Sequence, residues 1–103
     1  MYTVVLTVSL WKDEERQQHG KAFFRSIELP FAPFVGLSIE TSQFSSRRVT
    51  HVIWRDDEKY FLCGVEDRAA IRSGESGTTY EDLFEFLESE EGWTPANKWK
   101  RGA

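Results

Sequence analysis

Apolar residues alternate with polar residues along several stretches of the chain, and this period of two is typical of β-strands. In the first stretch Val4, Leu6, Val8 and Leu10 occupy one face. A polar loop follows at residues 12–20, and Pro30 and Pro33 end the second stretch because neither can donate a ladder hydrogen bond. The strands that the pattern predicts are residues 2–11, 21–29, 35–39, 49–56 and 59–67.

The last two predicted strands form the clearest hairpin, with a turn at Asp57-Glu58. The pairs that this register predicts are Val52 with Cys63, Ile53 with Leu62 and Trp54 with Phe61. One face then carries Val52, Trp54, Phe61, Cys63 and Val65, and the other carries Val49, His51, Ile53, Tyr60 and Leu62. Both faces are substantially apolar, so we expect the second face to be covered by a helix, by the curling sheet or by another subunit.

A helix is predicted near the C-terminal end. Thr78 or Thr79 can cap it, and Thr78 with Glu81 fits the capping-box pattern. Its apolar stripe is Tyr80, Leu83, Phe84 and Leu87. Gly92 suits the left-handed position past the helix end, and Trp93 can fold back onto the last turn.

Glu90 and Glu91 lie at the negative end of the helix dipole, where acids are mildly unfavourable. The sequence offers no structural reason for them, and we interpret them as part of a surface kept acidic for solubility or for a basic partner. Residues 68–77 are polar and glycine-rich, and they are expected to form a mobile loop.

Strands followed by one helix favour the α+β class. We expect a curled antiparallel sheet or small barrel of about five strands, with one C-terminal helix packed on it. The 103 residues suit one domain, assigned to residues 1–95. The basic tail, residues 96–103, should fray unless Trp99 docks.

Charge and composition exclude several classes. The formal net charge of −4 argues against wholesale binding to phosphate backbones. No stretch has the roughly 20 apolar residues that span a bilayer, so a membrane protein is not expected. Cys63 is the only cysteine, and residues 1–4 lack the basic start of a signal peptide, so the cytoplasm is the default location.

No catalytic, metal or cofactor site is predicted. In the hairpin register Cys63 and His51 project to opposite faces, and Cys63 is interpreted as a small core residue. The two histidines, His19 and His51, have no metal-ligand spacing with the acids. A small enzyme is therefore the third and least favoured hypothesis.

Two binding hypotheses remain. The leading one is a non-enzymatic protein-interaction module that self-associates through a sheet face or edge, as a homodimer, because the hairpin has two apolar faces and the chain is rich in aromatic residues. Trp11 and Trp99 are harder to bury in one small domain than Trp54 or Trp93, and the alternative is that the loop at residues 12–20 and the tail cover them. The alternative is a weak binder of nucleic acid or another anion through the arginines of the hairpin, although nearby acids dilute their field. The candidate partner-binding residues are Trp11, Arg47, Arg48, His51, Arg55, Tyr60 and Trp99.

Overall fold

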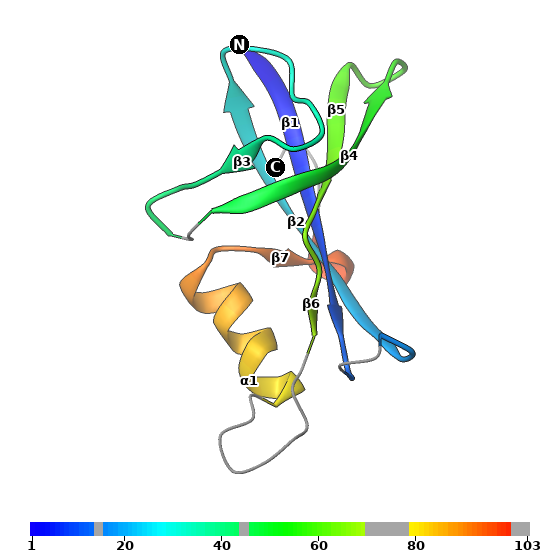
Figure 1. The fold of residues 1–103 in the computed structure, drawn as a ribbon, viewed down its shortest axis with the longest axis vertical. Coiled ribbons are helices and arrows are strands. Elements are labelled where there is room, and N and C mark those ends of the chain that lie inside the picture. Colours follow the sequence, from blue (N-terminus) through cyan, green and yellow to red (C-terminus); the bar gives the residue numbers. More distant parts are fainter. Residues whose placement is uncertain (14–15, 44–45, 70–78, 100–103) are drawn as a thin grey trace.

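The computed structural model describes residues 1–13, 16–43, 46–69 and 79–99. Its strands are β1 (Tyr2–Trp11), β2 (His19–Leu29), β3 (Ser38–Ile39), β4 (Arg47–Arg55), β5 (Tyr60–Val65), β6 (Arg68–Ala69) and β7 (Thr94–Pro95). They form one curled sheet in the order β3-β4-β5-β1-β2-β7, with β6 beside β1 (Figure 1). The predicted α+β class is confirmed.

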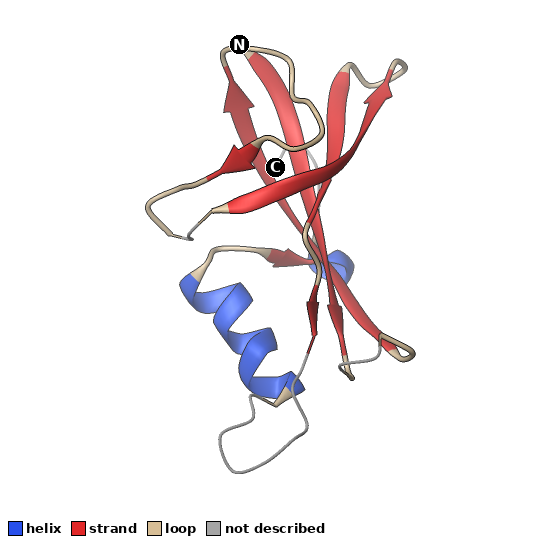
Figure 2. Ribbon diagram, viewed as in Figure 1, coloured by secondary structure: helices blue, strands red, loops and turns tan. Residues whose placement is uncertain are grey.

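The main helical segment is short and lies at one end of the sheet (Figure 2). It begins as α1 (Tyr80–Glu85), continues as a π-helical turn over Phe86–Glu90, and is followed beyond β7 by a 3-10 turn over Ala96–Lys98. Thr79 caps α1, because its hydroxyl accepts a hydrogen bond from the Asp82 amide at 3.1 Å. The alternative cap at residue 78 lies outside the described residues.

Gly92 has a φ of +75° and ends the helical segment in the left-handed conformation, as predicted. The amide of Trp93 then donates to the carbonyl of Leu87 at 2.9 Å, which folds the buried Trp93 back onto the last turn. None of the helices in the described part of the chain is both long and apolar enough to cross a bilayer.

The sheet is mixed. β1 pairs antiparallel with β2, and β4 pairs antiparallel with β5, but β1 runs parallel to β5 and to β6. The connection after β2 carries the chain to the far edge, where β3 pairs with β4, and β5 then returns beside β1 in the same direction. The sequence pattern identifies strands but not which non-consecutive strands meet, so this parallel pairing was not expected. Arg68–Ala69, expected in a loop, forms β6, while residues 70–77 lie outside the described residues.

The core lies between the inner face of the sheet and the helical segment. β1 contributes the predicted face, Val4, Leu6, Val8 and Leu10, all of which are buried. Leu87 and Trp93 cover part of this face from the C-terminal segment, and Phe23 comes from β2. The helical segment therefore packs on the sheet through two fully buried anchors.

The predicted hairpin register is confirmed for Val52–Cys63, Ile53–Leu62 and Trp54–Phe61. The register shifts between Val49 and His51, so that Val49 faces Val65 and His51 faces Gly64. This β-bulge turns Val49 into the core, where it is completely buried. The prediction that Val49 shares a face with Ile53 is therefore wrong, because one extra residue reverses the alternation.

The predicted third strand is shorter than expected. Only Ser38–Ile39 pairs with β4, while Gly36 has a φ of +96° and Val35 is exposed. A residue with positive φ cannot continue a regular strand, and glycine adopts that conformation without steric cost. The edge of the sheet beside β4 is consequently covered over a short distance only.

Candidate interaction surfaces

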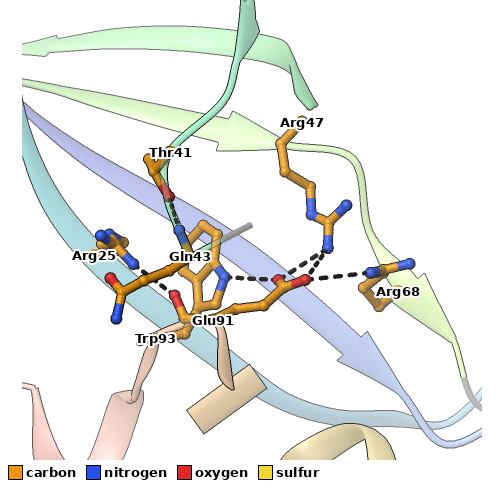
Figure 3. Close-up of polar contacts among 7 residues, drawn as sticks. All are labelled: Arg25, Thr41, Gln43, Arg47, Arg68, Glu91 and Trp93. Carbon is orange, nitrogen blue, oxygen red and sulfur yellow. Dashed lines mark hydrogen bonds and ion pairs between the residues drawn. The ribbon is translucent and has the colours of Figure 1, made fainter. Parts of the chain in front are cut away.

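Glu91 is the centre of a buried polar cluster (Figure 3). Its side chain is only 3% exposed, and Nη2 of Arg47 donates to both of its carboxylate oxygens at 2.8 and 2.7 Å. The indole Nε1 of Trp93 donates to Oε1 at 3.2 Å, and Nη2 of Arg68 lies 3.6 Å from Oε2. Arg25 donates to the backbone carbonyl of Glu91. The cluster joins β2, β4 and β6 to the end of the helical segment.

Two expectations are corrected by this cluster. Arg47, expected on the accessible hairpin surface, is only 7% exposed and is bound to Glu91. Glu91, interpreted from the sequence as a surface acid, neutralises arginines in the interior. Burial and the neighbouring charge of Arg47 lower the pKa of Arg68, and Glu91 opposes that change. Arg47 and Glu91 are far apart in the sequence, so no local sequence pattern could have predicted their ion pair.

The other basic residues of the hairpin are accessible. Arg48 is exposed and lies 3.5 Å from Glu66 in an ion pair. Arg55 pairs with Tyr60 across the hairpin, beside the acidic turn, residues 56–58. The ring of His51 lies over Gly64, where a Cβ atom would approach it to 1.9 Å. This surface therefore mixes both signs of charge.

Trp11 and Trp99 lie away from the hairpin and are each partly covered by the chain itself. Trp11 donates from Nε1 to Asp67 at 3.1 Å and meets the ring of His19 edge-on. Trp99 stacks on Phe24 with a centroid distance of 5.7 Å. The seven residues predicted to bind a partner are thus not gathered on one surface.

Exposed aromatic side chains gather where the N-terminal end of β1 meets the β4–β5 hairpin. Phe61 contacts Tyr2 and Trp54, with ring centroids 5.9 and 4.8 Å apart, and Trp54 is 47% exposed. Phe31 and Phe34, which sequence analysis missed, form a second exposed pair in the connection after β2. The signal that could have revealed them is the segment between Pro30 and residue 35, which is apolar without alternation.

The outer edge of β4 is open beyond its first residues. The amide of Val49 donates to Leu37 and its carbonyl accepts from Gly36, so the backbone of Val49 points away from β5. The carbonyl of Arg55 accepts from Lys59 at 2.7 Å, so the backbone of Arg55 points toward β5. On each side of the bulge, successive residues of β4 direct their backbone amide and carbonyl alternately toward β5 and away from it.

The same alternation places the amides and carbonyls of Val52 and Trp54 on the outer edge. Ile53, between them, directs its backbone toward β5. Within the described residues no strand pairs with β4 on this edge beyond Arg48, and the hydrogen bonds to Gly36 and Leu37 extend the cover only to Val49. Figure 1 shows this end of the hairpin on the side of the molecule opposite α1. Four backbone groups are therefore available for pairing with another chain.

Between the β-bulge and Arg55 the edge carries no charge or proline that would block pairing. Residues 50–54 contain no lysine, arginine, acid or proline, and Ile53 and Trp54 are exposed on opposite faces. The part of the β2 edge beyond β7 differs, because it contains Arg25 and Glu28 and is followed by Pro30. The β4 edge is the better pairing surface of the two.

The structure does not place Cys63 and His51, the Cys–His combination weighed from the sequence, opposite each other. Cys63 is buried in the core, as predicted, and burial raises its pKa from 9.0 to about 11. His51 faces Gly64 and not Cys63 across the hairpin. Within the described ranges, no three His, Cys, Asp or Glu side chains are grouped in a way that could hold a metal ion.

Comparisons with known protein families, with curated proteins and with solved structures found no match for this chain.

Proposed function

We propose that this chain is a non-enzymatic protein-interaction module that binds a second copy of itself through the open edge of β4. The observation that carries the proposal is the uncharged edge at residues 50–54, with unpaired backbone groups at Val52 and Trp54. Such an edge is a template for another strand, and natural proteins normally block it with charge, proline or a covering segment.

Side chains at the same edge add to the backbone contribution. Ile53 is 42% exposed and Trp54 is 47% exposed, on opposite faces of the sheet. A strand added beside β4 would remove apolar surface from water on both faces, at about 25 cal/mol per Å². Aromatic side chains such as Trp54 are also frequent anchors of protein interfaces.

A cytoplasmic location is part of this proposal. The one cysteine is buried in the core, so the fold does not depend on an oxidising compartment.

The alternative, binding of nucleic acid or another anion by the hairpin, has less support. Arg47 is occupied by Glu91, and Arg48 is paired with Glu66. Arg55 precedes three acidic residues, at positions 56–58. A phosphate backbone would meet a surface of mixed charge, whereas affinity for it depends on a basic footprint.

The test is sedimentation velocity at increasing micromolar concentrations. We expect the unmodified chain to form a dimer and Ile53→Lys to remain a monomer, because a charge would enter the paired edge. Phe86→Lys is the matched control, since Phe86 is also 42% exposed but lies in the π-helical turn. A folded, unmodified chain that stays monomeric throughout, or equal loss of the dimer in both variants, would refute the proposal.

The same samples distinguish the alternative. Binding to single-stranded nucleic acid that weakens as salt rises, and that Arg55→Ala abolishes without changing the oligomeric state, would favour the anion-binding hypothesis.

A further inference from the structure

We infer that two copies join their β4 strands antiparallel, about a twofold axis at Ile53, into one continuous sheet. The inference rests on the proposed self-association and specifies its register. The occupant of the open edge is a second β4 strand, and the interface spans residues 51–55.

The first step is the position of the outward backbone groups. Val52 and Trp54 each direct an amide and a carbonyl away from β5, while Ile53 and Arg55 direct theirs inward. A neighbouring antiparallel strand can form a hydrogen-bonded pair only with an outward residue. The β-bulge between Val49 and His51 ends this arrangement at one side, and the turn after Arg55 ends it at the other.

The second step is symmetry. Two identical strands that pair antiparallel are related by a twofold axis perpendicular to the sheet, so opposed residues lie on the same face. The axis must then pass midway between one residue and the same residue of the second copy. The possible centres within the exposed edge are Val52, Ile53 and Trp54.

The third step compares these three centres. With the axis at Ile53, Val52 of each copy pairs with Trp54 of the other, and all outward groups of both residues are satisfied in four hydrogen bonds. With the axis at Val52, Trp54 faces Thr50 in the bulge. With the axis at Trp54, Val52 faces Asp56 in the turn. Each of these alternatives keeps only the two hydrogen bonds of the central pair.

The side-chain pairs also favour a twofold axis at Ile53. Its half-exposed side chain meets its own copy in a non-hydrogen-bonded pair, where opposed side chains approach most closely. Trp54 lies opposite Val52 of the second copy on the inner face. An aromatic residue opposite a β-branched residue is a favourable cross-strand pair.

Charge favours an antiparallel second copy. The start of β4 carries the exposed Arg48, which forms an ion pair with Glu66, and the turn after β4 carries the acids at positions 56–58 together with Lys59, which pairs with Asp56. Antiparallel pairing directs this turn, with its three acids and one lysine, toward Arg48 of the other copy. Parallel pairing would place like charges together at both ends.

Disulfide trapping tests the register. Cα atoms in the central pair would lie about 4.5 Å apart, within the range that a disulfide can bridge. Ile53→Cys should therefore form a covalent dimer on mild oxidation. Trp54→Cys is the matched control with similar exposure, and its copies would lie about 8 Å apart, which exceeds that range. A mixture of Val52→Cys and Trp54→Cys chains should form the mixed dimer in preference to either homodimer.

Amide exchange tests the same register without substitution. The amides of Val52 and Trp54 should become protected as the concentration rises, while those of Ile53 and Arg55 should not change. A dimer whose disulfide forms at Val52→Cys or Trp54→Cys alone, or whose protection lies elsewhere, overturns the register and leaves self-association standing. Absence of any dimer in the unmodified chain overturns both proposals.

Discussion

Glu91 is a single carboxylate on which three other side chains depend. It accepts hydrogen bonds from Arg47 and Trp93 and lies within ion-pair distance of Arg68. A buried charge of this kind has little net stabilising effect compared with an apolar pair, but removing one partner leaves the other charge buried without compensation. The cluster therefore holds the helical segment on the sheet and makes the fold sensitive to one residue.

We predict that Glu91→Gln lowers the free energy of unfolding by about 3–5 kcal/mol, because Arg47 would lose its charged partner in the interior. Urea denaturation followed by circular dichroism measures this change. Glu90→Gln is the control, since Glu90 is exposed and adjacent, and its effect should stay within about 0.5 kcal/mol. Equal effects of the two substitutions would contradict the structural role of Glu91.

Cys63 gives a second prediction at this scale. Its pKa of about 11 in the folded protein leaves roughly one thiol in a thousand ionised at pH 8, and only the thiolate reacts readily. We expect no reaction with a thiol reagent on the native protein at pH 8 within minutes. Complete reaction should follow denaturation. Rapid labelling of the native protein would show that Cys63 is not buried as described.

The helical segment ends where Gly92 reverses the chain. A residue in the left-handed conformation is required at this position so that the amide of Trp93 can donate to the carbonyl of Leu87. The amide of Glu91 donates to Phe86, five residues earlier, which is the hydrogen bond of a π-helical turn. This wider turn leads directly into the buried cluster, so the end of the element is more constrained than its exposed start.

Gly92→Ala should therefore destabilise the protein more than Gly36→Ala. Both glycines have positive φ, which costs an L-residue about 1–2 kcal/mol. A Cβ atom at Gly92 would also lie 2.8 Å from Arg25, while nothing lies within 4 Å at Gly36. We expect the additional loss at Gly92 in urea denaturation. An equal loss at the two positions would show that Arg25 moves aside without cost.

The β4 strand shows which features a local sequence pattern can predict and which it cannot. Its register with β5 follows from the alternation and the turn between them, and the structure confirms three of the predicted pairs. The bulge at residues 49–51 has no such local signal, because Thr50 fits a strand in either register. The burial of Val49 and the set of backbone groups on the open edge both depend on that one extra residue.

For the whole molecule, the proposed self-association would link stability to concentration. A dimer that forms only from folded chains shifts the unfolding equilibrium by mass action. The midpoint temperature of the unmodified chain should therefore rise as its concentration increases. The measurement is calorimetry over a range of concentrations, with Ile53→Lys as the variant in which this dependence should disappear. A midpoint independent of concentration would contradict a folded dimer.

The sequence by itself determined the features that arise from neighbouring residues. The buried face of β1, the hairpin register, the left-handed Gly92 and the burial of Cys63 all follow from side-chain period, turn chemistry and residue type. The class of fold follows from the order of these elements, because strands followed by one helix have few ways to bury their apolar faces.

Only the tertiary structure decided which distant segments meet. The parallel pairing of β1 with β5, the union of Arg47 with Glu91 and the uncovered edge of β4 each depend on where the chain crosses after β2. The period of apolar and polar residues predicts whether a side chain is buried, but it does not predict which distant residue that side chain contacts. The surface proposed here for self-association therefore depends on contacts between segments that are far apart in the sequence.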